Sequence, residues 1–446
     1  MSKTKDSGRD QFRTAVGFVI ACVGSAVGMA NIWMFPYRAG KFGGAAFLIP
    51  YFIFVVLLGF SGVIGEMAFG RSMKTGPLGA FAGAAKLRFG EKGEKLGRAV
   101  GIIPVLGSLG IAVGYSVVVG WVLRYLFSAL TGELTQMENI GGFFGELTGP
   151  FGSVLWHMAG LTITFLIMLF GITKGIEKVN KVMMPVFFLF FVILLFRVAT
   201  LPGAMEGYKY LFVPEWSQLA NVNTWVYALG QAFFSLSLAG SGTVVYGSYL
   251  KKDADIIRCA KNVALFDTLA ALIAGMVVIP AVFVFGLDVA SGPPLMFITL
   301  PAVFQQMPFG GLFAVIFFLA VLFAAITSLM NLFETPTEAL QEQFGLSRAA
   351  AVGSIAVISS AVSVFIEEGN AVSSWMDVIS IYIIPLGALL AGIMFFWICP
   401  KGFAREQAEL GSKKKLGSWF EPLTRYVFVG ITLVVYVLGI FFGGIG

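Results

Sequence analysis

Long apolar runs alternate with short polar segments along the whole chain. Each run holds about twenty residues, which is the length that an α-helix needs to cross a hydrocarbon core of about 30 Å. The pattern predicts an all-α polytopic membrane protein with about eleven transmembrane helices, in one domain over residues 1–446. The predicted spans begin near Thr14, Gly43, Leu96, Gly152, Ile176, Asn223, Ile256, Phe309, Ala349, Val372 and Tyr426.

Two of these spans are interrupted by glycine and serine. Span one reads GSAVGMAN over residues 24–31, and span six reads SLSLAGSG over residues 235–242. Such residues make a helix easy to break, and backbone freed inside a bilayer must be buried in protein or line a polar cavity. Breaks at matching points predict two five-helix inverted repeats, residues 10–200 and 222–398, with discontinuous helices 1 and 6 and an extra helix over residues 424–443. The alternative is close helix packing through small residues.

Composition and charge indicate how the chain lies in the membrane. Hydrophobic residues make up 58% and charged residues 12% of the chain, so the lipid bilayer is its expected solvent. Of the 30 Lys and Arg residues, 25 fall on one side of the predicted spans, which the positive-inside rule assigns to the cytoplasm. This places the N-terminus in the cytoplasm and the C-terminus outside. The pI of 9.1 therefore reflects orientation and implies no nucleic-acid partner. The short tails and the lack of N-glycosylation sequences favour the cytoplasmic (inner) membrane of a bacterium.

Intramembrane enzymes need motifs that this sequence lacks. It has no HExxH, GxSxG or GxGD motif for a metal, serine or aspartate protease. Its three cysteines, Cys22, Cys259 and Cys399, imply no disulfide framework. We therefore expect that the protein is not an enzyme.

Carboxylates inside apolar helices are costly and usually mark a site or a structural pair. Asp267 has no cationic neighbour at helical spacing. Alone it would become protonated, whereas a bound monovalent cation would keep it charged. The hydroxyls of Thr327 and Ser328 either bind such an ion or bond to their own helix. Glu66 either accepts hydrogen bonds from unwound backbone or forms a fixed bond between helices. Hard oxygen ligands favour an alkali or alkaline-earth ion over zinc.

Several stretches resemble the neurotransmitter:sodium symporter family, specifically its eleven-helix bacterial branch. They cover residues 24–36, 43–47, 66–71, 230–238 and 324–328. The resemblance implies a sodium-coupled symporter of neutral, mainly hydrophobic amino acids that works by alternating access. A sodium-dependent amino-acid receptor, or a channel-like protein without concentrative transport, is the alternative.

The resemblance also implies two sodium sites and one substrate site at the breaks. Sodium site 1 would use the substrate carboxylate together with Ala26, Asn31, Ser235 and Asp267. Sodium site 2 would use the carbonyls of Gly24, Val27 and Ala324 and the hydroxyls of Thr327 and Ser328. The substrate would bind at Gly28, Met29 and Ala30, with its side chain in a pocket lined by Ile111, Tyr115, Phe234, Ser237, Gly240, Ser328 and Leu332.

Departures from the family pattern change two expectations. Asp267 stands where many relatives have Asn, and its charge would remove the need for chloride. Met34 replaces the arginine of the outer gate. Arg38 would then pair with Asp377, or else would lie in water at the edge of a loop. Gly28 leaves room for a substrate carboxylate, which favours an amino acid over a monoamine.

On the cytoplasmic side, the resemblance implies an inner gate formed by Arg9 and Glu342, with Tyr249 beside the pair. Gly175 and Pro185 resemble the motif that lets span five unwind, and a proline removes a helical hydrogen bond in any case. Access to the sites would therefore be controlled from both ends.

Overall fold

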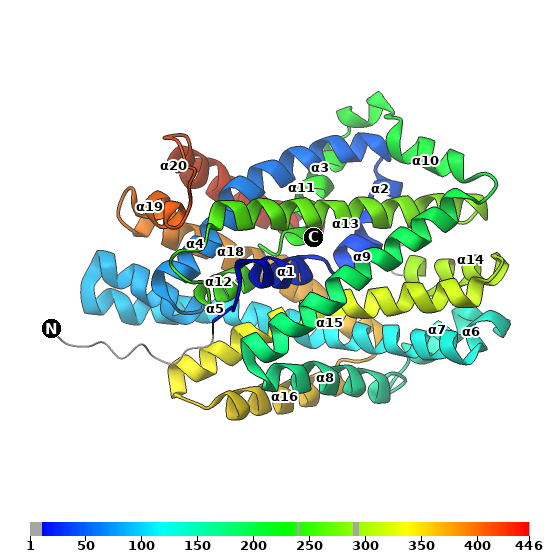
Figure 1. The fold of residues 1–446 in the computed structure, drawn as a ribbon, viewed down its shortest axis with the longest axis horizontal. Coiled ribbons are helices and arrows are strands. Elements are labelled where there is room, and N and C mark those ends of the chain that lie inside the picture. Colours follow the sequence, from blue (N-terminus) through cyan, green and yellow to red (C-terminus); the bar gives the residue numbers. More distant parts are fainter. Residues whose placement is uncertain (1–10, 239–240, 289–293, 446) are drawn as a thin grey trace.

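The structure is a computed structural model that describes residues 11–238, 241–288 and 294–445. Regular structure within these residues is helical throughout. Eight continuous helices are long and apolar enough to cross a membrane, and one bent pair adds a ninth candidate span. Figure 1 shows the helices running roughly side by side along the long axis of the molecule. The predicted all-α polytopic fold is confirmed.

Each of the eleven predicted spans overlaps one helix or one short series of helices. In chain order these are α1 (Ala15–Ala26) with η1 (Ala30–Met34) and α2 (Phe35–Lys41); α3 (Ala45–Leu58), η2 (Gly59–Val63) and α4 (Ile64–Met73); α5 (Pro77–Thr131); α8 (Val154–Leu169); η3 (Ile172–Glu177) and α9 (Lys178–Ala199); α11 (Val222–Ser235) and α12 (Gly242–Ser248). The remaining five are α13 (Ile256–Val284); α15 (Gly310–Phe344); α16 (Arg348–Phe365); α17 (Gly369–Val378), η6 (Ile379–Ile383), α18 (Ile384–Ile393) and η7 (Met394–Ile398); and α20 (Phe420–Pro422), η8 (Leu423–Phe428) and α21 (Val429–Phe442).

Short helices occupy the connections between spans. They are α6 (Glu133–Gln136), α7 (Ile140–Leu147), α10 (Ala204–Phe212), η4 (Trp216–Ala220), η5 (Leu295–Thr299), α14 (Leu300–Gln306) and α19 (Phe403–Glu409). Span three begins close to its predicted start near Leu96, because α5 is bent at Gly90 and its first part, from Pro77, precedes the span. The chain turns at Gly90, whose φ of 66° and ψ of −156° suit glycine. Because the residues near this turn are charged, the search for long apolar runs did not detect the helix that precedes it.

The chain leaves helical geometry at both predicted breaks. In span one, α1 ends at Ala26, Val27 is extended with φ −73° and ψ 100°, and the two halves are bent by 55°. In span six, α11 ends at Ser235, and Ser237 and Ser241 have positive φ angles of 54° and 57°. Residues 239–240 of this break lie outside the described residues. The division into inverted repeats stays a prediction.

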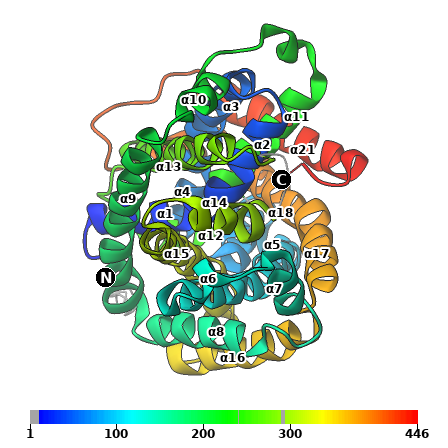
Figure 2. The same cartoon turned by 90° about the vertical axis from the view of Figure 1, so that its right-hand side faces the viewer.

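The broken helices lie near the centre of the bundle. Figure 2 shows α1 and α12 surrounded by α5, α13, α15 and α18. In the most apolar stretches of α5, α13 and α15, 67% of the residues are buried, against 22% in the helix that ends the chain. The breaks are therefore enclosed by the protein's most buried helices, as unwound backbone inside a membrane requires.

Candidate functional site

A carboxylate lies where three helices meet at the two breaks. Asn31 Nδ2 donates hydrogen bonds to Asp267 Oδ1 at 2.7 Å and to Ser235 Oγ at 3.1 Å. Ser235 Oγ donates to Asp267 Oδ2 at 2.8 Å. All three side chains are fully buried. We name Asn31, Ser235 and Asp267 the carboxylate cluster; it joins η1, the last residue of α11 and α13.

The charge of Asp267 is not neutralised by a protein cation. No ion pair of Asp267 with Lys, Arg or His occurs in the described part of the chain. Amide and hydroxyl donors satisfy part of the carboxylate but bring no positive charge. Asn31 keeps its amide fixed, because its Oδ1 accepts from the Gly28 N–H at 3.1 Å. Ala26 is the buried last residue of α1. The arrangement fits a small cation held by oxygen atoms.

A second group of oxygens surrounds the end of α1. Ser328 Oγ lies 3.2, 3.2 and 3.3 Å from the carbonyl oxygens of Gly24, Ser25 and Val27, respectively. One hydroxyl has one hydrogen and cannot serve three acceptors. We name Gly24, Val27, Ala324, Thr327 and Ser328 the carbonyl cluster. Its acceptors outnumber its donors, which again favours a cation.

The sequence left two roles open for Thr327, binding an ion or bonding to its own helix. Its Oγ1 lies 3.0 Å from the carbonyl oxygens of Phe323 and Ala324, so it bonds to its own helix. The lone pairs of the same oxygen stay available, since the hydroxyl acts there as a donor. Bonding to the helix and binding an ion are therefore compatible at Thr327.

The predicted substrate residues gather between these two clusters. The Met29 N–H donates to Tyr115 Oη at 3.2 Å. A Cβ on Gly28 would lie 2.8 Å from Ser328 Oγ and 3.1 Å from Tyr115 Oη. Ser237 Oγ donates to the Ser25 carbonyl at 3.1 Å, which links the two breaks directly. The side chains of Ala30, Ile111, Phe234 and Leu332 are half-buried. Gly240 lies outside the described residues.

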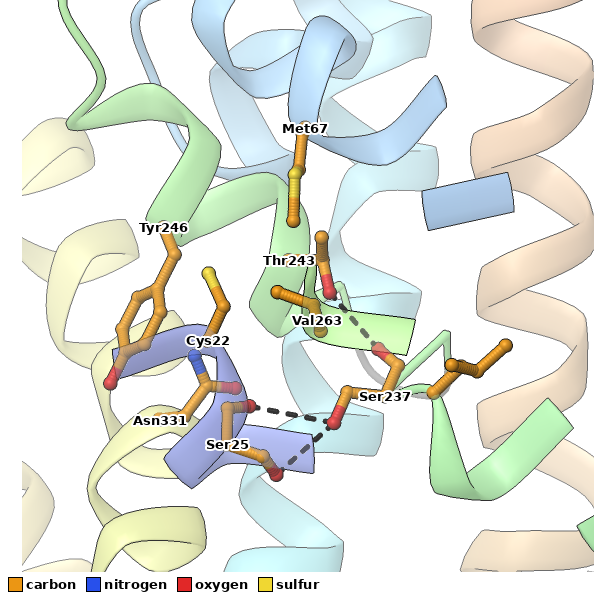
Figure 3. A pocket seen from close by; sticks show the side chains of 9 residues that line it. Cys22, Ser25, Met67, Ser237, Thr243, Tyr246, Val263 and Asn331 are labelled. Carbon is orange, nitrogen blue, oxygen red and sulfur yellow. Dashed lines mark hydrogen bonds between the residues drawn. The ribbon is translucent and has the colours of Figure 1, made fainter. Parts of the chain in front are cut away.

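A small hollow lined by both polar and apolar side chains adjoins the same breaks. Figure 3 shows Ser25, Ser237, Thr243 and Asn331 around it, with Cys22, Met67, Tyr246 and Val263 as further lining. Thr243 Oγ1 donates to the Ser237 carbonyl at 3.3 Å. Polar side chains in the centre of an apolar bundle are costly. Their concentration here indicates that the breaks form one polar region.

Comparisons with known proteins agree with this geometry. The sequence profile of the sodium:neurotransmitter symporter family matches residues 9–140 and 145–440. The chain belongs to this family. It is a sodium-coupled transporter and not an enzyme.

Relatives in this family extend over most of the chain. An uncharacterized sodium-dependent transporter of Bacillus subtilis, YhdH, is 39% identical over 327 residues, which are 73% of this chain and 71% of the relative. A similar transporter of Methanocaldococcus jannaschii, MJ1319, is 31% identical over 96% of this chain and 90% of the relative. The crystal structure of MhsT in complex with L-phenylalanine superposes on this chain with a TM-score of 0.85 and 32% sequence identity. The match covers 97% of this chain and 100% of the MhsT chain.

At the predicted outer gate, Arg38 does not form the predicted pair with Asp377. Arg38 is buried and donates to Gln231 Oε1 at 3.2 Å, and its guanidinium lies 5.8 Å from the centre of the Tyr227 ring. Gln231 Nε2 donates to the Ala30 carbonyl at 3.0 Å. Asp377 is exposed. The alternative of a loop-edge arginine in water is also wrong, because Arg38 packs against α11.

At the predicted inner gate, Tyr249 contacts a different carboxylate from the predicted one. Tyr249 Oη donates to Glu334 Oε1 at 2.7 Å. Arg348 forms a bidentate pair with the same carboxylate at 2.6 and 2.7 Å. Glu334 is fully buried, and the backbone of Phe12 donates to the Tyr249 carbonyl at 3.3 Å. Glu334 and Arg348 were not among the predicted site residues, although an acid inside an apolar helix was an available signal.

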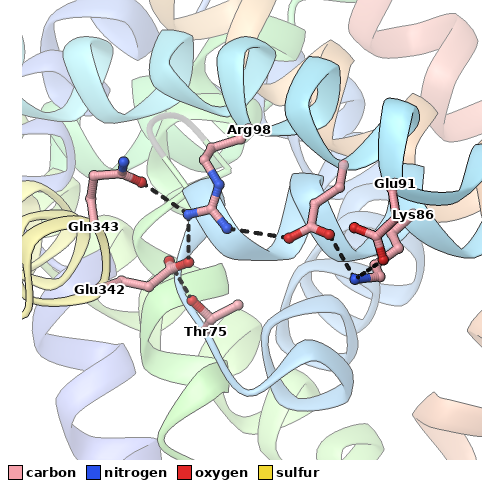
Figure 4. Close-up of polar contacts among 7 residues, drawn as sticks. Thr75, Lys86, Glu91, Arg98, Glu342 and Gln343 are labelled. Carbon is pink, nitrogen blue, oxygen red and sulfur yellow. Dashed lines mark hydrogen bonds and ion pairs between the residues drawn. The ribbon is translucent and has the colours of Figure 1, made fainter.

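Glu342 belongs to a separate polar group near the end of α15. Figure 4 shows it with Thr75 and Arg98; Thr75 Oγ1 donates to it at 2.7 Å and Arg98 at 3.2 Å. Lys86 pairs with Glu94 at 2.7 Å in the same group. The structure thus separates Glu342 from Tyr249, which corrects the predicted arrangement. Arg9 lies outside the described residues.

The structure also describes the other predicted residues, Glu66, Gly175 and Pro185. Both carboxyl oxygens of Glu66 are buried and have no hydrogen-bond partner among the described residues, so neither predicted bond is formed with them. Gly175 lies in η3, where a Cβ would come within 2.2 Å of the Ile167 carbonyl, so its role in close packing is clear. Pro185 lies inside α9.

Proposed function

We propose that this transporter carries neutral, mainly hydrophobic amino acids together with sodium by alternating access. The observation that carries the proposal is the carboxylate cluster. Asp267 is fully buried and joins residues from both broken helices. A cation bound there would neutralise the carboxylate and hold the two breaks in one arrangement.

The substrate carboxylate would bind between the two clusters. The second half of span one begins near Met29 and Ala30, and free N–H groups at the start of a helix favour an anion. The Met29 N–H donates to Tyr115 Oη, which leaves the hydroxyl hydrogen of Tyr115 to donate to a carboxylate bound beside Met29. Gly28 leaves space there, because any side chain would meet Tyr115 and Ser328.

The rest of the substrate would contact apolar side chains. Ile111, Phe234 and Leu332 are half-buried, and the predicted pocket carries no charged residue. A neutral apolar side chain suits such a lining. The structure of MhsT with L-phenylalanine supports a substrate of this class, because that chain is 32% identical over nearly the full length.

Two sodium ions per substrate would match the two clusters, one charged and one neutral. Chloride would not be required, since Asp267 already supplies the negative charge near the ion. The protein would lie in the cytoplasmic membrane of a bacterium, with its N-terminus inside and its C-terminus outside. A receptor or channel-like protein would bind the same ligands without concentrating them.

Uptake into proteoliposomes tests the proposal. Purified protein is reconstituted, and uptake of labelled neutral amino acids is measured with an inward gradient of sodium or of potassium. We expect accumulation above the external concentration with sodium only, and the same rate when chloride is replaced by gluconate. Equal uptake in potassium would contradict sodium coupling. Sodium-dependent binding without accumulation would favour the receptor alternative.

A further inference from the structure

Asn180 presents an oxygen atom that no hydrogen bond explains. Its side chain is fully buried in α9. Asn180 Nδ2 donates to the Ile176 carbonyl at 2.9 Å, whereas Oδ1 has no hydrogen-bond partner in the described part of the chain. The bond to Ile176 fixes which atom is nitrogen, because only the amide nitrogen can donate. The oxygen therefore points away from Ile176.

This oxygen faces the carbonyl cluster. The position that a Cβ on Gly24 would occupy lies 2.0 Å from Asn180 Oδ1 and 3.0 Å from Thr327 Cβ. Gly24 lies in α1 and Thr327 in α15, and both helices pack against α9 and against each other. Asn180 Oδ1 is thus enclosed between the two helices that supply the predicted ligands of sodium site 2.

The polar groups near Asn180 Oδ1 include more hydrogen-bond acceptors than donors. The carbonyls of Gly24 and Val27 are acceptors, and the single hydrogen of Ser328 Oγ cannot serve both. Asn180 adds a further acceptor without a donor. Buried acceptors that lack donors are costly unless a cation lies among them.

No Lys or Arg side chain in the described part of the chain donates a hydrogen bond to Asn180 Oδ1. Lys181, one residue after Asn180, pairs with Glu177 at 2.6 Å. Glu177 in turn accepts from the backbone N–H of Arg13 at 2.7 Å. Lys181, the basic residue that follows Asn180 in α9, therefore already pairs with a carboxylate.

We propose that Asn180 Oδ1 is an additional ligand of the ion at sodium site 2, supplied by span five. The inference rests on the proposed function, since it assumes that sodium binds the carbonyl cluster. A carboxamide oxygen is a hard, neutral ligand and suits an alkali ion. It would add a ligand from α9 to those from α1 and α15, without changing the charge of the site.

Sodium titration of thermal stability tests this assignment without any amino acid. The purified full chain is titrated with sodium at constant ionic strength with choline, and the sodium concentration for half-maximal stabilisation is recorded. We expect Asn180→Ala to raise that concentration about tenfold, the usual effect of removing one buried polar partner. Asn223→Ala, at an exposed asparagine, should leave it unchanged.

Two variants of similar size separate ligation from packing. Asn180→Leu should weaken sodium binding as Asn180→Ala does. Asn180→Asp should strengthen it, increasingly so from about pH 6 to pH 8.5 as the new carboxyl loses its proton. If Asn180→Ala or Asn180→Leu fails to fold, the result for Asn180→Asp alone decides whether Asn180 binds the ion. An unchanged sodium requirement in Asn180→Asp at high pH would overturn the assignment.

A double-mutant cycle assigns the residue to one of the two sites. Asn180→Ala and Thr327→Val should be non-additive in sodium affinity, whereas Asn180→Ala and Ser235→Ala should be nearly additive. The reverse pattern would overturn the assignment. If the wild-type protein shows no stabilisation by sodium at all, the proposed function fails instead, so the two failures are distinguishable.

Discussion

The two clusters at the helix breaks differ in how they would attract a cation. The carboxylate cluster contains Asp267, which a bound cation would keep negatively charged, with Asn31 and Ser235 as hydrogen-bond donors. The carbonyl cluster holds only neutral oxygens, and its hydroxyls have too few hydrogens for its acceptors. A charge attracts a cation strongly but is costly when the cation leaves. Neutral dipoles attract it less and depend more on geometry. Substitutions in the two clusters should therefore differ in size and in kind.

The largest effect is expected for Asp267→Asn. Removing the charge should weaken sodium binding by about 3 kcal/mol, or roughly 100-fold, and should make the remaining binding stimulated by chloride. Sodium-dependent thermal shifts with and without chloride provide the measurement. The control is Asp253→Asn, an exposed aspartate in the loop after α12. Unchanged sodium affinity would show that Asp267 has a structural role only.

The next effect is expected for Gly28→Ala, between the clusters. The new Cβ would lie 2.8 Å from Ser328 Oγ and 3.1 Å from Tyr115 Oη, in the space assigned to the substrate carboxylate. Amino-acid affinity should fall by about 2 kcal/mol, or roughly 30-fold, from overpacking. Equilibrium binding of the transported amino acid at saturating sodium measures it. Gly353→Ala, in open space on α16, is the matched control. Equal losses in both variants would contradict this placement.

Thr327→Val should have a smaller effect. Valine keeps the shape but removes one neutral ligand, so sodium affinity should fall by about 1 kcal/mol, or roughly fivefold, with no response to chloride. The matched control is Thr164→Val, because Thr164 Oγ1 also donates to its own helix, at 2.9 Å from the Gly160 carbonyl. A chloride response in Thr327→Val would remove the distinction between the clusters.

The smallest effect is expected far from both clusters, for Arg98→Ala. Arg98 pairs with Glu342, and the two side chains are 33% and 23% exposed. Pairs of this kind contribute about 1 kcal/mol or less to stability. Unfolding temperature should change little, and sodium affinity should stay within about twofold of the wild type. A large loss of sodium binding would show that this inner group is coupled to the breaks.

The sequence predicted the breaks and the polar residues at them, because both depend on local composition. Glycine and serine at residues 24–31 and 235–242 weaken the helix wherever neighbouring helices lie. A lone acid such as Asp267 is conspicuous in an apolar run. The grouping of Asn31, Ser235 and Asp267 into one site came from the resemblance to the symporter family and not from the composition of any one span.

The gates could not be predicted in the same way, because they depend on how helices are placed beside one another. Arg38 has several polar groups within reach, and only the position of α11 selects Gln231. Tyr249 contacts Glu334 and not Glu342, which lies two turns further along α15. The π-helical turns could not be predicted from the sequence either, because one extra residue in a turn hardly alters the pattern of an apolar run.

Reciprocal linkage between sodium and amino acid tests the central claim most directly, since both would bind at one pair of breaks. The sodium concentration for half-maximal stabilisation is measured at increasing concentrations of the transported amino acid, and amino-acid affinity is measured at increasing sodium. Each ligand should strengthen the binding of the other by the same factor, and Asp267→Asn should abolish this coupling. Independent binding of the two ligands to the wild-type protein would contradict it.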